Sequence, residues 1–352
     1  AGHCNHCTRY DARVAALPPD SDALPALIKR IQRAGKKRPY DCVIGVSGGV
    51  DSTYVAYIVK EELGLRPLAV HLDNGWNSEL AVSNIEQVLK TLDIDLYTYV
   101  IDWEEFRDLQ LSFLKASTPD GEIPTDHAIV ALLKSVAAQH RIRYILSGEN
   151  VRTEGILPNA WARGHSDWRY IRHVHKRFGS RPLKSFPRFG IGSLLTYSLI
   201  KRQRHIHILD HVPFNRRDAI DILESKLGWR SYGAKHHESI YTRFFQGVIL
   251  PTKFHIDKRR AHLSALICGG QTDRETALVE MTTPPCPPQQ ADEDREYVTK
   301  KLGITSGEFD AIMTAPPKTY WDYPSSYTNP FTKLGIRVAL RLPTFLERMG
   351  YT

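Results

Sequence analysis

Residues 42–52 read Cys42-Val43-Ile44-Gly45-Val46-Ser47-Gly48-Gly49-Val50-Asp51-Ser52. The apolar first half predicts a strand, and a helical pattern follows from Ser52 onward. Between them, two glycines let the backbone approach an anion, two serines supply hydroxyl groups, and the helix start directs N–H groups and its dipole at the same point. The carboxylate of Asp51 is explained if it binds Mg²⁺ that neutralises phosphates. The stretch therefore predicts a phosphate-binding loop.

A Walker-type loop does not explain this pattern, because no G-x-x-x-x-G-K-[ST] occurs in the chain. An ordinary glycine-rich turn is the structural alternative. The pattern resembles the pyrophosphate-binding loop (PP-loop) of the N-type ATP pyrophosphatases, which split ATP into AMP and pyrophosphate to activate an oxygen atom. The resemblance implies that Asp51 binds Mg²⁺ and that four loop residues bind pyrophosphate: Ser47, Gly48, Gly49 and Ser52.

Strand and helix patterns alternate through the first half of the chain. We expect strands at 41–46, 67–72, 96–101 and 143–146, and helices at 52–62, 78–92, 103–115 and 126–140. Strands joined by helical crossovers predict an α/β fold with a doubly wound parallel sheet. The resemblance of the loop implies a sheet of the PP-loop ATP pyrophosphatase (HUP-like) type. Ligands of such sheets bind at the carboxyl ends of the strands, near the point where strand order reverses.

Polar residues follow two of these strands. The second strand ends in His71-Leu72-Asp73-Asn74-Gly75, and the fourth in Ser147-Gly148-Glu149-Asn150. In PP-loop enzymes these positions surround the adenosine, so the resemblance implies that His71, Asp73 and Gly148 bind ATP. Taken alone, Asp-Asn-Gly is equally consistent with an ordinary turn.

The composition is that of a globular enzyme. The chain has 352 residues, of which 42% are hydrophobic and 24% charged, as is usual for proteins with one large core. No apolar run reaches the roughly 20 residues that span a bilayer, and no secretory leader is visible. Five cysteines, an odd number, argue against a disulfide framework. We therefore expect a cytoplasmic protein.

The net charge of +8 is concentrated in one segment. Between Arg163 and Arg204, eleven Lys and Arg residues accompany a single acidic residue, Asp167, so the segment carries +10. A solvated face, an anionic substrate, a nucleic acid and a membrane surface all fit this charge. From Glu149 to about Asp210 the pattern is irregular, basic and aromatic, which is typical of an active-site wall or lid.

A second polar cluster, Lys235-His236-His237-Glu238-Ser239, precedes Arg243. Adjacent histidines point in different directions, which disfavours a metal site. One interpretation is a polar helix start capped by Glu238 or Ser239. The functional interpretation places a cation near the ATP phosphates and a base or positioning group near the acceptor.

Five blocks occur in order along the chain. They are the PP-loop, Pro124-Thr125-Asp126-His127, His175-Lys176-Arg177-Phe178-Gly179, Leu227-Gly228-Trp229-Arg230 and Lys235-His236-His237-Glu238-Ser239. Together, over residues 4–280, they resemble the N-acetyl sugar amidotransferase family of lipopolysaccharide O-antigen and flagellar-glycan biosynthesis. Members of that family are cytoplasmic. They use ATP and ammonia to convert an acetamido group on a nucleotide-linked sugar into an acetamidino group.

The resemblance implies an AMP-forming carbon–nitrogen ligase that adenylates the acetamido oxygen of a sugar such as a UDP-linked diacetamido uronic acid. The implied catalytic residues are Asp51, Lys235, Glu238 and Arg243. The implied substrate-binding residues are Asp126, Glu149, His175, Lys176, Arg177, His236 and His237. The basic segment would receive the diphosphate of the nucleotide sugar.

The family also suggests a role for Cys4-Asn5-His6-Cys7. Its members usually begin with two C-x-x-C pairs, and four thiolates close a tetrahedral zinc site. Only one pair is present, so zinc at Cys4 and Cys7 requires a further pair before residue 1, or the site is vestigial. We interpret the other three cysteines as buried or incidental: Cys42, Cys268 and Cys286.

No glutaminase element is recognisable in the sequence. We therefore expect ammonia from separate glutaminase and ammonia-channel proteins that resemble the two subunits of imidazole glycerol phosphate synthase. No stable nucleic-acid partner is expected. Three other functions stay open: a tRNA-modifying PP-loop enzyme, a carboxylate amidotransferase of the asparagine-synthetase type, and a non-catalytic nucleotide-binding regulator.

Composition predicts three parts of the chain. Residues 1–38 hold a short cysteine knuckle and a helix, and residues 39–250 form the PP-loop domain with a basic insertion at about 150–210. Residues 251–352 form a mainly helical region that contains the Pro-rich spacer at 282–288.

Overall fold

The computed structural model describes residues 3–17, 23–232 and 238–329. Its centre is a five-stranded sheet in the order β3-β2-β1-β4-β5, and every neighbouring pair is parallel. The strands are β1 (Cys42–Gly45), β2 (Pro67–Asp73), β3 (Asp95–Val100), β4 (Tyr144–Ser147) and β5 (Arg204–His207). The doubly wound parallel sheet predicted from the sequence is therefore confirmed.

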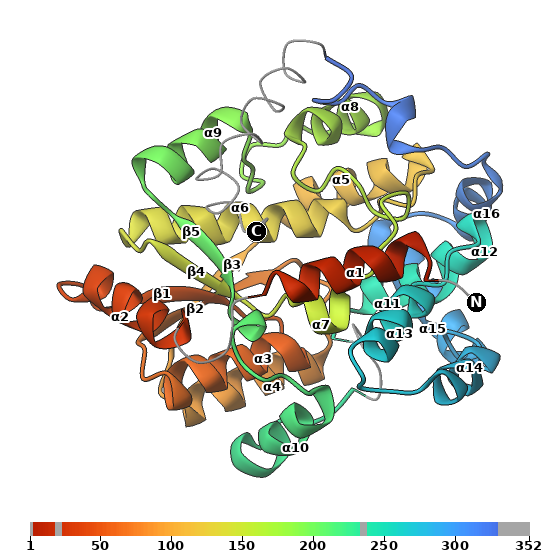
Figure 1. Cartoon of the computed structure of the whole chain (residues 1–352). Helices are drawn as coiled ribbons and strands as arrows, with labels where there is room; N and C mark the ends of the chain where they lie inside the picture. The colour runs from red at the N-terminus through yellow and green to blue at the C-terminus, as the bar shows by residue number, and fades with distance from the viewer. Residues whose placement is uncertain (1–2, 18–22, 233–237, 330–352) are drawn as a thin grey trace.

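Helices cover both faces of the sheet (Figure 1). One face carries α2 (Ala23–Gly35), α3 (Val50–Tyr57), α4 (Glu79–Thr91) and α10 (Arg216–Leu227); the other carries α5 (Trp103–Ala116), α6 (Ile123–Gln139) and α8 (Trp168–Phe178). The remaining α-helices are α1 (Asn5–Ala15), α7 (Val151–Glu154), α9 (Ile191–Leu195), α11 (Ile240–Phe244), α12 (Leu250–Phe254), α13 (Arg259–Cys268), α14 (Arg274–Thr282), α15 (Pro288–Leu302) and α16 (Ser306–Thr314). Wider or tighter helical turns are η1 (Ile58–Glu62), η2 (Thr196–Ile200), η3 (Ile208–Asp210), η4 (Phe245–Ile249) and η5 (Tyr320–Asp322). The described residues after 250 are helical or irregular, as predicted.

Local sequence explains where these helices begin. Ser78, Asp102 and Asn215 are the N-cap residues of α4, α5 and α10, and each accepts a hydrogen bond from a first-turn N–H. Helix α10 ends at Gly228, which adopts φ +67° and so closes the helix in a conformation that favours glycine.

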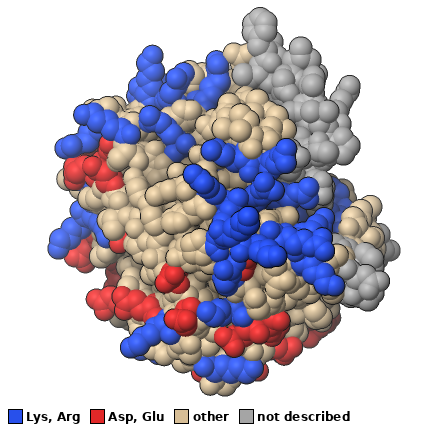
Figure 2. Space-filling model, turned by 90° about the vertical axis from the view of Figure 1, so that its left-hand side faces the viewer, with Lys and Arg blue, Asp and Glu red and all other residues tan. Residues whose placement is uncertain are grey.

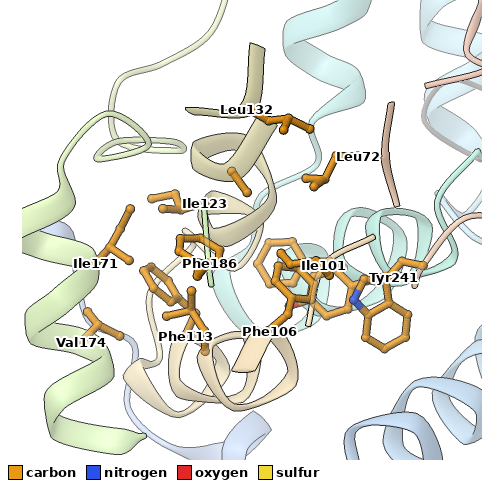
Figure 3. Packing of buried hydrophobic residues seen from close by; sticks show 14 of the residues in the cluster. Leu72, Ile101, Phe106, Phe113, Ile123, Leu132, Ile171, Val174, Phe186 and Tyr241 are labelled. Atoms are coloured by element: carbon orange, nitrogen blue, oxygen red, sulfur yellow. The ribbon is translucent and has the colours of Figure 1, made fainter. Parts of the chain in front are cut away.

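Two apolar clusters hold the layers together, one on each side of the sheet. Figure 3 shows the larger one, in which Phe106 and Phe113 of α5 lie with Phe186 and with Ile171 of α8. The strands contribute from both faces because Val43 and Ile44 are each fully buried but point to opposite sides. The buried β1 therefore reads as a continuous apolar run, as strands in parallel sheets do.

The prediction of an irregular segment from Glu149 to Asp210 is wrong. This segment contains the short α7, α8, the continuous α9–η2 helix and the fifth strand. Strand β5 has no apolar pattern that would predict it, because Arg204-His205-Ile206-His207 lies at the sheet edge and all four residues are only half-buried. Helix α8 buries Ile171 and Val174, but six of the ten residues after Trp168 are Arg, Lys or His, and they obscure the apolar periodicity.

Strand order reverses between β1 and β4. The chain runs outward from β1 through β2 to β3, and then returns to form β4 and β5 on the other side. The loop that follows β1 lies at this reversal, which is where doubly wound sheets bind ligands. The fold thus places the PP-loop at the carboxyl edge of the sheet. The division of the chain into three parts stays a prediction.

Candidate active site

The PP-loop is a tight connection between β1 and α3. Ser47 N–H donates to Ser52 Oγ (3.2 Å), Gly49 N–H donates to Ser47 Oγ (3.3 Å), and the two hydroxyls lie 3.1 Å apart. Gly49 precedes α3 and has no side chain to cap its first turn. The first-turn N–H groups and the helix dipole are therefore directed at the space over the loop, as an anion site requires.

Glycine is required in the loop and beside it for steric reasons. Gly48 adopts φ +83°, and a Cβ there would lie 2.8 Å from the carbonyl oxygen of Ala81. A Cβ on Gly148, which follows β4, would lie 2.9 Å from the backbone of Asp51. Gly148 thus lets the end of β4 pack directly against the first turn of α3, and its contact with ATP stays a prediction.

Two aromatic side chains hold the loop from the outside. Trp229 Nε1 and Tyr232 Oη both donate to the carbonyl oxygen of Gly48, at 2.8 Å and 2.9 Å. Asn84 donates to Tyr232 Oη (2.9 Å) and to the carbonyl of Arg230 (2.8 Å), so α4 fixes the segment that carries both rings. Burial raises the pKa of Tyr232 to about 12, so its hydroxyl stays a donor. This arrangement is the Gly48 clamp: Asn84, Trp229 and Tyr232.

The end of β2 is braced against the loop and against α6. His71 is buried, and its Nδ1 lies 2.9 Å from the carbonyl oxygen of Val46 while its Nε2 lies 3.1 Å from Asn77 Nδ2. Asn74 donates to Thr125 Oγ1 (3.2 Å) at the start of α6. Asp73 is half-buried and accepts from the N–H of Gly75. His71 is therefore a brace in this structure, and adenosine binding by His71 and Asp73 stays a prediction.

Glu238 connects the second cluster to the PP-loop. A Cβ on Gly49 would lie 3.1 Å from Glu238 Oε1, and the carbonyl of Glu238 accepts from the N–H of Ser78 (2.9 Å). Ser239 forms an isolated antiparallel β-bridge with Asn77. Its side chain also caps α11, as the structural interpretation of this cluster predicted. Three predicted site residues of the cluster lie outside the described residues: Lys235, His236 and His237.

Arg243 of α11 forms an ion pair with a carboxylate on α15. Its guanidinium donates to both carboxylate oxygens of Asp294 on α15, at 2.7 Å and 2.6 Å, and both side chains are largely buried. A buried bidentate pair of this kind joins two helices. This pair gives Arg243 a structural role, and its catalytic role stays a prediction.

The loop between α5 and α6 contains carboxylates that the sequence reading did not single out. Asp120 is buried, and burial raises its pKa to about 6 although the N–H of Arg163 (3.2 Å) and the Tyr170 hydroxyl (3.0 Å) both donate to it. Glu122 accepts from Lys258 Nζ at 2.7 Å. The predicted Asp126 is exposed in the first turn of α6. Since Asn74 donates to Thr125, this helix start lies beside the end of β2, at the carboxyl edge of the sheet.

The other predicted substrate residues are spread more widely. Glu149 is 63% exposed beside β4, 3.7 Å from Nδ1 of His207 at the end of β5. His175 contacts Asp108 of α5 at 2.9 Å, while Lys176 and Arg177 are exposed in the last turn of α8. Figure 1 shows α8 beyond α5, on the opposite side of the sheet from α3. The structure therefore does not bring the block at 175–179 to the PP-loop.

The N-terminal cysteines begin α1. Their Sγ atoms are 3.5 Å apart, a separation compatible with two ligands of one zinc ion. Cys268 at the end of α13 is exposed and lies near them; burial raises its pKa, as do Cys7 and Cys4. The view of Cys268 as buried or incidental therefore needs correction, whereas Cys42 and Cys286 are buried. Across the described ranges, no three His, Cys, Asp or Glu side chains form a metal-binding group, so zinc stays a prediction.

Magnesium has a better-placed candidate. Asp51 lies in the first turn of α3, half-buried, with its backbone against Gly148. A carboxylate at this point would hold Mg²⁺ beside the phosphates of a bound nucleotide. The residues present therefore fit the predicted ion.

Several residues of the site were missed by sequence reasoning. The Gly48 clamp was hidden because Trp229 and Tyr232 reach a loop about 180 residues earlier in the chain. Its signal was the Leu-Gly-Trp-Arg block, which was noted without a role. The Pro119-Asp120-Gly121 turn gave no chemical signal, because only burial distinguishes Asp120 from an ordinary turn aspartate.

Comparison with known families finds two matches in this chain. Residues 24–117 match NAD synthase, and residues 238–337 match the C-terminal domain of the LPS (lipopolysaccharide) biosynthesis protein WbpG-like family. An uncharacterized protein of Methanocaldococcus jannaschii is 27% identical over 139 residues, which are 38% of this chain and 48% of that protein. The glutamine-hydrolyzing GMP synthase of Pyrobaculum aerophilum is 31% identical over 98 residues, 28% of this chain and 19% of that protein. The chain thus spans less than half the length of either relative.

Solved structures with partial likeness include two enzymes. The NH3-dependent NAD synthetase of Campylobacter jejuni gives a TM-score of 0.31 at 13% identity, over 80% of this chain and 95% of the other. The tRNA thiolase NcsA of Methanococcus maripaludis gives 0.34 at 14% identity, over 71% and 80%. Such distant likenesses say nothing about function. Among the helices of the described residues, none is both long and apolar enough to cross a membrane.

Proposed function

Because the chain joins a PP-loop ATP pyrophosphatase domain of the NAD synthase type to a WbpG-like C-terminal domain of lipopolysaccharide biosynthesis, we propose that it is an ATP-dependent amidotransferase. Its acceptor is the acetamido group of a nucleotide-linked N-acetyl sugar, such as a UDP-linked diacetamido uronic acid. One observation carries the proposal. Glu238, the first residue of the WbpG-like match, lies against Gly49 of the PP-loop.

The chemistry follows from the poor reactivity of an amide. In the first step the acetamido oxygen attacks the α-phosphorus of ATP; the new P–O bond forms as the bond to pyrophosphate breaks. In the second step ammonia adds to the activated carbon, the C–O bond breaks, and AMP leaves with the former acetamido oxygen. A proton from ammonia is released as the amidinium product forms. ATP, ammonia and the sugar amide thus give the acetamidino sugar, AMP and pyrophosphate.

Each part of the site has a task in this scheme. The first turn of α3, Ser47 and Ser52 bind the departing pyrophosphate through N–H and hydroxyl groups. Asp51 would hold Mg²⁺, which would supply positive charge beside the leaving group. The Gly48 clamp keeps the loop carbonyl turned outward, so that the loop N–H groups keep their direction. The carboxylates between α5 and the first turn of α6, together with Glu238, orient the acetamido group or accept the proton of ammonia.

Other properties belong to the same proposal. Ammonia comes from separate glutaminase and channel proteins, and the enzyme acts in the cytoplasm, where nucleotide sugars are made. The exposed cations at 176–177 contact the acceptor only if the nucleotide sugar extends along α8, because they lie far from the loop.

The test follows the acceptor oxygen. The enzyme is incubated with ATP, Mg²⁺, ammonium and a UDP-diacetamido uronic acid labelled with ¹⁸O in the acetamido group. The expected result is one ¹⁸O atom in AMP and a sugar product whose mass is that of the amidine. Pyrophosphate release that needs no sugar, or unlabelled AMP, would contradict the proposal; label transfer from a tRNA or a carboxylate would point to the other open functions.

A further inference from the structure

The helix formed by α9 and η2 turns a row of large apolar side chains toward solvent. Ile191 is 42% exposed, Leu195 38%, Leu199 50% and Ile200 73%. The first three are spaced by four residues and so lie on one side of the helix. The opposite side is held by the protein, since Leu194 is buried in a small cluster with Ala131 and Phe189. We call these four exposed residues the apolar stripe.

Basic residues follow the apolar stripe in sequence and also occur on a second helix on the same side of the molecule. Lys201 and Arg202 follow Ile200 directly, and no acidic residue occurs from 191 to 209. Helix α2, on the same side of the molecule in Figure 1, also lacks acidic residues; its Lys29, Arg30 and Arg33 line a surface cavity of about 610 Å³ together with His211. Figure 2 looks at this side and shows Lys and Arg gathered in a broad patch.

We propose that this side of the molecule binds the surface of an anionic lipid bilayer. Exposed Leu and Ile on one side of a helix, with cations beside them, have the composition of helices that lie in a membrane interface. The apolar stripe enters the boundary between headgroups and acyl chains, while Lys201, Arg202 and the cations of α2 lie at the lipid phosphates. This inference does not depend on the proposed amidotransferase reaction.

A second copy of the chain is a poorer occupant of the same surface. A two-fold contact pairs a patch with itself, so Lys201 and Arg202 would face a surface of the same charge. An internal comparison supports this reasoning. Leu278 and Val279 on α14 are 52% and 68% exposed, but Glu275 and Glu280 flank them. That pair has similar exposure and acidic neighbours, which makes it a matched control.

The experiment measures binding of the full chain to sedimented vesicles of phosphatidylcholine alone, or with about one third phosphatidylglycerol. Wild type is expected to bind the anionic vesicles about tenfold better or more, because cations near such a surface are attracted to its anionic lipids. The double variants Leu199→Ser with Ile200→Ser, and Lys201→Gln with Arg202→Gln, should each lose about tenfold. The control Leu278→Ser with Val279→Ser should bind like wild type.

Other outcomes overturn the inference. It fails if wild type does not distinguish the two vesicle compositions, or if the control variant loses as much binding as the stripe variant. It also fails if Leu199→Ser with Ile200→Ser leaves vesicle binding unchanged and alters only self-association, measured by sedimentation velocity without lipid. All substituted residues are exposed, and equal melting temperatures show that the variants fold. Pyrophosphate release without vesicles reports on the proposed reaction separately.

Discussion

The PP-loop and the basic segment from 163 to 204 both attract functional interpretation from sequence, but their side chains have different surroundings. In the PP-loop, a Cβ on Gly48 would lie 2.8 Å from the carbonyl oxygen of Ala81, and one on Gly49 would lie 3.1 Å from Glu238 Oε1. In the basic segment, many of the noted groups contact the protein itself: His175 contacts Asp108, and Arg177 lies over the ring of Tyr323. A motif defined by backbone geometry therefore points to function more securely than a count of charges.

His127, in the block Pro124-Thr125-Asp126-His127, also makes its contacts within the protein. His127 stacks on Phe189 with ring centres 4.3 Å apart, and its Nε2 accepts from the N–H of that residue. Its Nδ1 lies 2.7 Å from the carbonyl oxygen of His165, and burial lowers its pKa to about 4. His127 thus fastens the basic segment to α6 as a neutral ring. Predictions that separate the two regions follow, from the largest expected effect to the smallest.

Asp51→Ala should lower sugar-dependent pyrophosphate release about 1000-fold, because the carboxylate that would hold Mg²⁺ is lost where charge develops. Steady-state release with saturating ATP measures the effect. The control is Glu79→Ala, which removes an acidic residue from the first turn of the neighbouring α4. Equal losses of pyrophosphate release in both variants would mean that Asp51 matters no more than an exposed acidic residue nearby.

Asp120→Asn should change how stability depends on pH. Burial raises the pKa of Asp120 from 3.8 to about 6, so its contribution favours folding fully below pH 3.8 and is lost as the pH rises through about 6. A rise of this size corresponds to about 3 kcal/mol. Urea unfolding of both proteins from pH 4 to pH 7 should show the wild type losing about that much relative to the variant. Parallel curves would mean that Asp120 ionises as in water.

Gly48→Ala should destabilise the fold by about 2 kcal/mol more than Gly64→Ala. Both glycines have positive φ, +83° and +59°, but a Cβ at Gly64 meets nothing within 4 Å, whereas one at Gly48 meets Ala81. The pair therefore separates backbone strain from the close approach within the loop. Urea midpoints measure it, and equal losses would remove the steric argument for the loop.

Replacing Lys176 and Arg177 together by Ala should have the smallest effect. If the acceptor reaches α8, the KM for the nucleotide sugar rises about fivefold while the KM for ATP is unchanged, since exposed charges contribute little each. His175→Gln is the contrasting variant, because it weakens a contact with Asp108 inside the protein; it should lower the melting temperature instead. An increase in the KM for ATP in the first variant would contradict the separation of the two regions.

Asp108 shows why sequence reading was weaker for the basic segment. Its pKa lies below the ordinary value although burial alone would raise it, because Ser180, Arg181 and His175 donate to it. These partners lie about 70 residues later in the chain, so no local pattern reveals them. By contrast, the first four strands and the PP-loop were predictable, since apolar runs and glycine spacing are local properties.

The same difference between local patterns and contacts made only on folding applies to the candidate site. Ser47, Gly48, Gly49 and Asp51 could be placed because strand, turn and helix follow one another without interruption. Trp229, Tyr232 and Asn84 could not, because their shared target is a carbonyl oxygen brought near only by folding. The pairing of Arg243 was not predictable for the same reason, since its partner Asp294 lies 51 residues away on another helix.

The hydrogen bonds of Asp167 bear on how such a chain could evolve. This buried carboxylate caps α8 and also accepts from Tyr320 and from Ser326, which belong to the WbpG-like region. The Gly48 clamp joins the residues just before that region to the nucleotide loop in a comparable way. A recombination that exchanged the C-terminal region between distant relatives would leave these polar groups without their partners. The C-terminal region is therefore expected to be inherited together with the part of the chain that precedes it, as one unit of selection.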